Sequence, residues 1–226
     1  MDKRFWAVVG VILIVFGGIF WATSNKTDAP SDKSGGKQAS NHVEGENSAG
    51  ITLVEYGDFQ CPGCGQYSQP LKDTIAKYKD KIAFQFRNYP LTQIHQNAFA
   101  ASRAAEAASL QGKFWEMHDL LFQQNVIYYA AQQQEKTYNT WLNATDPLAF
   151  FTEYAKKLGL DTAKFKTDYA SEKVNKVINA DVAAGAELKV DSTPTFFLDG
   201  EKIQPSPTVE SLSNFIDSAI EAKTKN

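Results

Sequence analysis

The sequence is poor in the residues that cross-link chains or bind metals. Its 226 residues contain only two cysteines and three histidines. One cysteine pair closes a single bridge, so the chain is not a disulfide-stapled scaffold, and two thiols do not complete a four-thiolate zinc site. His42 falls in a polar segment, and His95 and His118 are not spaced like a ligand pair. We expect the latter two to lie at the surface or in a helical cap, and we expect no metal site.

The sequence also lacks a large excess of charge of one sign. The formal net charge is −3, and internal repeats are absent. Nothing therefore points to a nucleic-acid partner. Hydrophobic residues make up 43% of the chain and aromatic residues 12%, which is enough for a substantial core. The length predicts one domain with extensions, or two domains at most.

Long apolar runs are scarce, with one exception near the N-terminus. Residues 5–22, FWAVVGVILIVFGGIFWA, carry no charge and end in Trp residues, after the basic stub MDKR at 1–4. A helix of this length extends about 27 Å, at the short end of a bilayer span. We expect a single-pass anchor with a cytoplasmic N-terminus and an extracytoplasmic remainder. A buried core helix and a cleaved signal peptide are the alternatives; the poor cleavage site disfavours the second.

A polar segment follows the apolar run. Residues 23–50, TSNKTDAPSDKSGGKQASNHVEGENSAG, lack aromatic side chains and are rich in Ser, Gly, Asn and Lys. This composition is typical of a flexible linker. The catalytic domain is then expected to occupy residues 51–226.

The domain opens with a strand, a helix and a strand. Residues 51–59, ITLVEYGDF, are β-rich, and Pro62 suits the first turn of a helix that continues to about Lys79 with a kink at Pro70. Residues 82–91, IAFQFRNYPL, form the second strand. This order predicts a right-handed βαβ unit.

The rest of the chain is mostly helical. Helices are expected over 97–125, 147–158, 162–170 and 172–188, whereas 126–145 is ambiguous. Residues 193–203 predict two short strands joined at Asp199-Gly200, and 207–223 predict a closing amphipathic helix. The fold class is therefore α/β: a small sheet domain interrupted by an all-helical insertion at about 93–190.

The two cysteines stand between the first strand and the first helix. In CPGC, Cys61 occupies the expected N-cap, where free backbone N–H groups and the helix dipole favour a thiolate. Cys64 lies one turn on, within reach for a disulfide. A redox pair is favoured over half of a metal site. Two inert buried cysteines are disfavoured too, because a Pro-Gly turn is not expected to bury its flanks.

Several stretches together resemble the DsbA family of thioredoxin-fold thiol–disulfide oxidoreductases. They are EYGDFQCPGCGQYS, FRNYPL, QGKFWEMHDLLF and the Thr193-Pro194 step before FFLDG, and the resemblance covers roughly residues 51–222. It implies a thioredoxin fold with a helical insertion. It also implies an extracytoplasmic enzyme that oxidises cysteine pairs in exported proteins.

The resemblance assigns roles to five residues. Cys61 is the implied nucleophile and Cys64 the resolving cysteine. Pro194 is implied to be a cis-proline facing the dithiol, so that the backbone of Thr193 is offered to an extended substrate. Glu55 matches a carboxylate in the preceding strand. One departure concerns the motif: strongly oxidising members carry His where Gly63 stands here.

Glu55 can also be interpreted from its position alone. It shares a strand face with Ile51 and Leu53, so we expect partial burial, a raised pKa and proton exchange with Cys64, directly or through water. An ordinary carboxylate at a strand end is the alternative. Asp58 lies closer to the cysteines in sequence but on a loop, and we expect it to be solvated.

These inferences predict a thiol–disulfide oxidoreductase that needs no cofactor and no metal, because the disulfide is itself the redox agent. Oxidation of exported proteins is the favoured direction; a reductase or isomerase, and a non-catalytic chaperone-like binding module, are the alternatives. We expect a monomer whose substrates are reduced or unfolded exported proteins. The expected reoxidant is a membrane quinone-linked partner similar to DsbB or a vitamin K epoxide reductase homologue.

Overall fold

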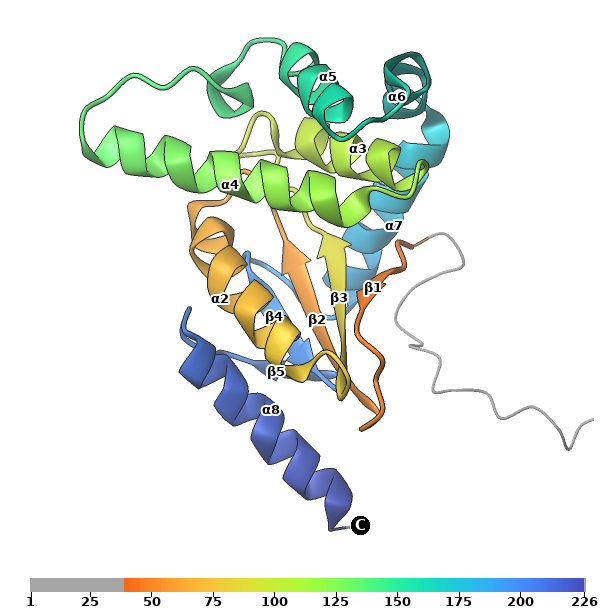
Figure 1. Ribbon diagram of the computed structural model, residues 1–226, viewed down its shortest axis with the longest axis vertical. Helices are drawn as coiled ribbons and strands as arrows, with labels where there is room; N and C mark the ends of the chain where they lie inside the picture. The colour runs from red at the N-terminus through yellow and green to blue at the C-terminus, as the bar shows by residue number, and fades with distance from the viewer. Residues whose placement is uncertain (1–38, 226) are drawn as a thin grey trace, which may run out of the picture. The chain divides into compact units, whose positions relative to one another are not determined.

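A computed structural model describes residues 39–225 (Figure 1). The predicted stub at 1–4, the anchor at 5–22 and most of the predicted linker lie outside these residues. Within 39–225 no helix combines the length and the apolar character that a membrane crossing requires.

A five-stranded mixed sheet forms the centre, in the order β1-β3-β2-β4-β5. The strands are β1 (His42–Glu44), β2 (Ile51–Gly57), β3 (Ile82–Asn88), β4 (Thr195–Leu198) and β5 (Glu201–Ile203). β2 and β3 run parallel, and the other neighbouring pairs are antiparallel. The predicted turn joins β4 to β5, with positive φ angles of 50° at Asp199 and 85° at Gly200.

The predicted βαβ unit is present. Helix α2 (Pro62–Tyr78) connects β2 to β3 and buries Leu71, Ile75 and Tyr78 against the sheet. Helix α8 (Val209–Thr224) runs beside α2, and the Tyr78 hydroxyl donates a 2.7 Å hydrogen bond to Asp217 on it. Figure 1 shows both helices in front of the same sheet face.

Five helices lie between β3 and β4, where the sequence predicts four. They are α3 (Ala98–Ser109), α4 (Phe114–Gln133), α5 (Leu148–Lys157), α6 (Thr162–Tyr169) and α7 (Glu172–Glu187), with a short 3-10 helix η1 (Trp141–Asn143). The single helix expected over 97–125 is wrong: the chain breaks near Gly112, whose φ is +74°. The ambiguous segment begins as a continuation of α4 to Gln133.

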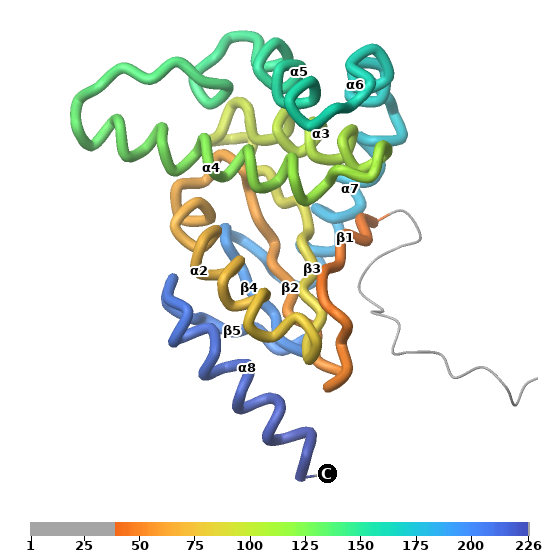
Figure 2. The backbone as a smooth tube through the Cα atoms, in the orientation of Figure 1, coloured from red at the N-terminus to blue at the C-terminus, as the bar shows by residue number. Residues whose placement is uncertain are grey.

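Helices α3 to α6 lie above the ends of β2 and β3 (Figures 1 and 2). They share one hydrophobic core with the sheet, in which Phe59 and Phe86 meet Phe122 of α4. The described residues belong to one compact unit rather than to two. The segment expected as an insertion at about 93–190 is mostly helical, but its core is continuous with that of the sheet.

The predicted flexible linker extends too far. Its last part, from Ser40 onward, is folded onto the domain through β1, which pairs with β3. The Ser40 N–H donates to buried Asp181 at 2.9 Å. The His42 ring stacks on Phe114 at 3.4 Å and contacts Glu106 at 2.8 Å. Polar residues can belong to a folded segment when their polar groups have buried hydrogen-bond partners. The polar composition of residues 23–50 therefore wrongly predicted a linker that reaches residue 50.

Candidate active site

The dithiol lies at the junction of β2 and α2. Cys61 is the N-cap of α2, as predicted, with φ −68° and ψ 125°, and Pro62 starts the helix. The expectation that the Pro-Gly turn leaves its flanks exposed is wrong, because Cys61 is 7% exposed and Cys64 1%. Packing of the turn under α4 and against Thr193 causes this burial.

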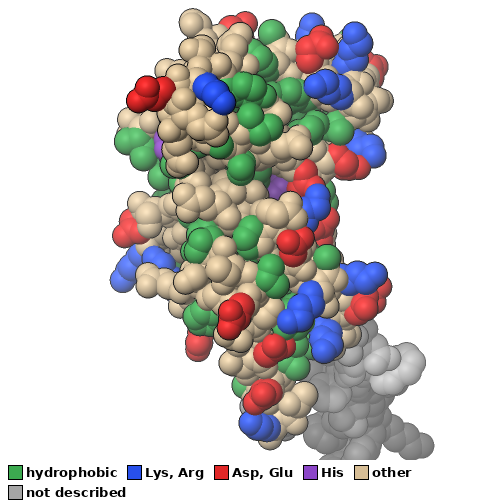
Figure 3. Space-filling model, turned by 60° about the vertical axis from the view of Figure 1, so that its left-hand side comes forward, with side chains coloured by type: hydrophobic (Ala, Val, Ile, Leu, Met, Phe, Trp, Pro, Cys, Tyr) green, Lys and Arg blue, Asp and Glu red, His purple; other side chains and the backbone are tan. Residues whose placement is uncertain are grey.

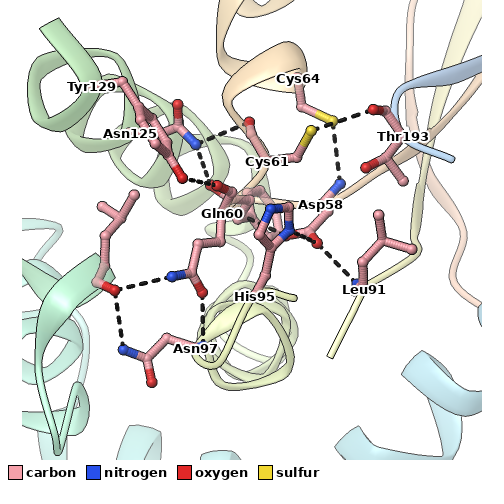
Figure 4. Close-up of polar contacts among 12 residues, drawn as sticks. Asp58, Gln60, Cys61, Cys64, Leu91, His95, Asn97, Asn125, Tyr129 and Thr193 are labelled. Carbon is pink, nitrogen blue, oxygen red and sulfur yellow. Dashed lines mark hydrogen bonds and ion pairs between the residues drawn. The ribbon is translucent and has the colours of Figure 1, made fainter. Parts of the chain in front are cut away.

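Cys61 is tuned toward the thiolate. Its pKa is lowered to about 6, first by a hydrogen bond from the Cys64 thiol and further by the Thr193 side chain and the Cys64 backbone N–H. Burial and the charge of Asp58 act in the opposite direction. In the thiol form, Cys61 Sγ donates to the Thr193 carbonyl oxygen at 3.3 Å (Figure 4). Cys61 is therefore the thiol that ionises near neutral pH.

Cys64 has the opposite tendency. Burial raises its pKa well above the usual value, and the hydrogen bond to Cys61 and the charges of Glu55 and Cys61 raise it further. A hydrogen bond from the Asp58 backbone N–H to Cys64 Sγ, at 3.5 Å, only partly offsets this. Cys64 therefore stays a neutral thiol where Cys61 is ionised.

Glu55 is buried beneath the dithiol, as predicted. It is 2% exposed, and burial, with a smaller contribution from the Cys61 charge, raises its pKa to about 8. It borders a cavity of about 480 Å³ whose lining also includes Lys72, Glu116 and Asp119. The cavity thus reaches from a buried protonated carboxyl to charged side chains nearer the surface.

The Thr193-Pro194 bond is cis, as the resemblance implied. This segment faces the CPGC turn: a Cβ on Gly63 would lie 3.4 Å from Pro194 Cδ and 3.5 Å from Cys61 Sγ. These are ordinary contact distances, so space does not demand glycine at position 63. The Thr193 hydroxyl is buried and has no hydrogen-bond partner in the described part of the chain, which leaves it available to the sulfur.

One residue of the site was misjudged from the sequence. Asp58, expected to be solvated, is 0% exposed and holds His95, Nδ1 to Oδ2, at 2.7 Å. His95 and His118, expected at the surface or in the helical cap, both lie in the segment between β3 and β4, with side chains 13% and 10% exposed. No spacing rule links residues 58 and 95, which only the fold brings together.

Helix α4 holds the motif from the other side, a role that the sequence did not suggest. Asn125 donates to the backbone oxygens of Phe59 and Cys61, at 2.9 and 3.1 Å. The Tyr129 hydroxyl donates to the Gln60 carbonyl oxygen at 3.0 Å (Figure 4). These bonds satisfy backbone acceptors beside the helix N-terminus and fix the loop that carries Cys61.

A groove of about 580 Å³ lies next to the motif, between α2 and α4. Its lining includes Pro62, Gln66, Val126 and Tyr129, and no lining residue is charged. Figure 3 turns this side toward the viewer, and uncharged side chains cover much of the middle of the face. Within residues 39–225, no group of three or more His, Cys, Asp or Glu side chains is arranged to hold a metal ion.

Comparison with known proteins places this fold and dithiol in a family. The protein-family model described as thioredoxin matches residues 37–218. The chain belongs to the thioredoxin family. Its CPGC motif and cis-Pro194 are therefore part of a thioredoxin-family domain.

Solved structures with the same fold include DsbA proteins, which confirms the expected resemblance at the level of the fold. α-DsbA1 of Wolbachia pipientis is 19% identical, with a TM-score of 0.65 over 80% of this chain and 92% of that chain. Oxidised BdbD of Bacillus subtilis is 21% identical, with a TM-score of 0.63 over 79% and 92%. A thioredoxin-like oxidoreductase of Silicibacter pomeroyi gives 20% and 0.63 over 87% and 98%.

Among curated proteins, the thioredoxin-family chain matches segments of longer proteins. The Na⁺/H⁺ antiporter NhaA 1 of Salinispora arenicola is 38% identical over 179 residues, which are 79% of this chain and 24% of that protein. NhaA 3 of Salinispora tropica is 38% identical over 178 residues, with the same shares. The chain thus spans about a quarter of the length of these relatives, and their name is not transferred to it.

Proposed function

We propose that the chain is a thiol–disulfide oxidoreductase that introduces disulfides into exported proteins through Cys61 and Cys64. One observation carries the proposal: two thiols within one helical turn have opposite tendencies, with the pKa of Cys61 lowered to about 6 and that of Cys64 raised. A structural pair gains nothing from this asymmetry. An exchange catalyst needs one good thiolate and one thiol held in reserve.

The reaction in the oxidising direction has two exchanges. A substrate thiolate attacks Cys61 Sγ of the Cys61–Cys64 disulfide, which forms a mixed disulfide and releases Cys64 as a thiolate that takes up a proton. A second substrate thiolate then attacks the substrate sulfur of the mixed disulfide and releases Cys61. The substrate gains one disulfide, and the enzyme pair is reduced by two electrons.

Glu55 is the proposed proton donor and acceptor for Cys64. With a pKa raised to about 8, its carboxyl holds a proton at neutral pH and can give it to the Cys64 sulfur as that sulfur leaves. The cavity that Glu55 borders gives water a route for resupplying the proton. This role deepens the sequence-based interpretation of Glu55 without adding a cofactor.

The state that the fold stabilises supports the oxidising direction. A low pKa for Cys61 lowers the free energy of the reduced enzyme, and this makes its disulfide a better oxidant. Reduction or isomerisation of substrate disulfides is the same chemistry run under another redox poise. The redox potential decides between these directions.

The proposed substrates are reduced, extended segments of exported proteins. The uncharged groove beside Pro62 suits chains of varied sequence, and the Thr193 backbone beside Cys61 suits pairing with an extended segment. We further propose that the apolar segment 5–22 anchors the domain outside the cytoplasmic membrane, near a quinone-linked reoxidase.

Oxidative refolding of a reduced, disulfide-containing protein tests the proposal. The full-length chain is expected to restore activity to reduced ribonuclease in a glutathione buffer, and Cys61→Ser is expected to lose this effect. Ser68→Ala, on the same helix, is the matched control for a small change near the motif. A chaperone-like binding module would assist refolding equally well with Cys61→Ser, and that result would contradict the proposal.

A further inference from the structure

Asp58 is a buried carboxylate that the exchange mechanism does not yet use. It is 0% exposed and lies in the loop between β2 and α2, three residues before Cys61. Its oxygens accept from the backbone N–H groups of Gln60, at 2.7 Å, and Leu91, at 2.9 Å. Its third contact is the Nδ1 atom of His95 at 2.7 Å.

His95 comes from the connection between β3 and α3. Its backbone N–H donates to the Leu91 oxygen at 2.9 Å, and its own oxygen accepts from Ala98 at 3.2 Å. The side chain is 13% exposed. The backbone thus holds the imidazole firmly, while the ring keeps some access to solvent.

The Asp58–His95 pair is tied directly to the dithiol. The Asp58 carbonyl oxygen accepts from the Cys61 N–H at 3.1 Å, and the Asp58 N–H donates to Cys64 Sγ at 3.5 Å. Figure 4 shows His95 paired with Asp58, whose backbone N–H donates to the Cys64 sulfur next to Cys61. A change in charge on this pair therefore occurs beside the reacting sulfur.

We propose that His95, held by Asp58, is a positioning residue that supplies positive charge beside the Cys61 thiolate. Pro62 and Gly63 carry no charge, so the motif itself cannot provide it. This inference rests on the proposed exchange function of Cys61. It deepens that function by assigning the charge that stabilises Cys61 as a leaving group.

Besides the hydrogen bond to Asp58, the charge of Cys61 is among the factors that raise the pKa of His95, and thermodynamic linkage makes such a coupling reciprocal. The hydrogen bond to Asp58 is the largest factor that raises the pKa of His95, burial acts against it, and the charges of Asp58 and Cys61 raise it further. Burial raises the pKa of Cys61, and the charge of Asp58 raises it further. The other ionisable groups that interact with Cys61 are Cys64, Glu55 and Tyr129, all with raised pKa values. Those three raised pKa values favour the neutral forms, whereas the raised pKa of His95 favours its cation.

The charge acts in a defined step. When the second substrate thiolate attacks the mixed disulfide, the bond between the substrate sulfur and Cys61 Sγ breaks, and the electron pair leaves on Cys61. The imidazolium of His95 is opposite in sign to this thiolate and stabilises it. In the absence of that charge, the Asp58 carboxylate would repel the leaving sulfur.

The unaltered protein provides the first test. Histidine NMR of the full-length chain, titrated in the reduced and oxidised states, reports the pKa of His95 directly, with the resonance assigned by its absence in His95→Gln. We expect His95 to titrate at higher pH in the reduced state, because the Cys61 thiolate is present only there. Equal titration in the two states would overturn the proposal.

Variants separate a charge effect from a purely structural one. His95→Gln keeps a hydrogen-bonding side chain but removes the charge, and we expect the pKa of Cys61 to rise by roughly half a unit to one unit. Adding Asp58→Asn should return that pKa toward the original value, since the repelling carboxylate is gone. Lys164→Gln, an exposed charge removal on α6, is the control and should change nothing.

The outcomes are decisive. An unchanged Cys61 pKa in His95→Gln, or a double variant that departs further than the single one, would show that His95 only holds the loop. Failure of the proposed function is a separate result, because it would appear as refolding that does not depend on Cys61. The NMR titration would still report whether Cys61 and His95 are coupled.

Discussion

The two sides of the dithiol are built in opposite ways. On the β2 side, Glu55 is buried in the core, and burial raises its pKa to about 8. On the loop side, Asp58 is equally buried, yet it accepts two backbone N–H groups and pairs with His95. The same chemical group thus lies in two environments, three residues apart.

The difference shows how one motif holds two unlike thiols. The core side, with a protonated Glu55 and little solvation, keeps Cys64 neutral. The pKa of Cys61 is lowered to about 6, first by the hydrogen bond from the Cys64 thiol and then by the Thr193 side chain. Charge separation across the motif comes from the hydrogen bond between the two thiols, which lowers the pKa of Cys61, and from burial, which raises that of Cys64.

Removing the Cys64 thiol should have the largest effect on the difference between the two cysteines. In Cys64→Ala, a mixed disulfide formed at Cys61 has no partner to resolve it and accumulates, whereas Cys61→Ala should trap nothing because Cys64 is buried and neutral. Non-reducing electrophoresis of the two variants after exposure to a disulfide-bonded substrate measures this. Adducts in Cys61→Ala alone would reverse the assignment.

Replacing the Glu55 carboxyl by an amide should have the next largest effect. Glu55→Gln keeps the size but cannot exchange a proton, and we expect the step that protonates or deprotonates Cys64 to slow by roughly tenfold or more. Stopped-flow measurement of dithiol oxidation across pH follows this step. A wild-type rate and pH profile in Glu55→Gln would remove Glu55 from the mechanism.

Redox state should change the pH dependence of stability. In the reduced chain the folded pKa of Cys61 is about 6 against a reference of 9.0, a depressed value, so its stabilisation is full above the unfolded pKa and is lost as pH falls through 6. The oxidised chain lacks this contribution. We expect the reduced form to gain about 1 to 2 kcal/mol over the oxidised form between about pH 6 and pH 8, after a discount for solvent screening.

Denaturant titrations of both redox forms across pH measure this difference in the free energy of unfolding. Glu55 provides a control in them, because its pKa is shifted in the opposite direction. Its raised pKa means that its stabilisation is present at low pH and is lost as pH rises through about 8. Because this slope occurs in both redox states, it largely cancels in their difference. A reduced form that is less stable than the oxidised form at all pH values would favour a reductant pair or a structural bridge.

The smallest expected effect concerns the hydroxyl beside the sulfur. Thr193→Val keeps the shape but removes the group that helps to lower the pKa of Cys61, and we expect that pKa to rise by roughly half a unit. Thr195→Val, whose hydroxyl bonds to the Ser192 oxygen instead, is the matched control. Equal pKa values in the two variants would exclude the Thr193 hydroxyl.

Local patterns predicted much of this molecule. The βαβ unit, the N-cap position of Cys61 and the inward direction of Glu55 each follow from a few neighbouring residues. The cis state of Pro194 was available only through the family resemblance, since most X-Pro bonds are trans.

The features that the sequence did not predict depend on contacts between distant segments. Asp58 looked solvated because its partner His95 is 37 residues away, and Asn125 contacts the Cys61 carbonyl oxygen across 64 residues. The strand β1 was missed because its stability comes from buried partners of Ser40 and His42, not from its own composition. Such pairs leave no periodic trace in one sequence.

The central claim is that burial and the hydrogen bond between the two thiols divide the dithiol into one thiolate and one thiol. Ultraviolet absorbance of the reduced full-length chain, titrated with pH and compared with Cys61→Ser, measures it most directly. The account predicts a single thiolate that appears with a pKa of about 6 and vanishes in Cys61→Ser, with Cys64 titrating only well above the usual range. No thiolate below about pH 8, or two thiols that titrate together, would contradict it.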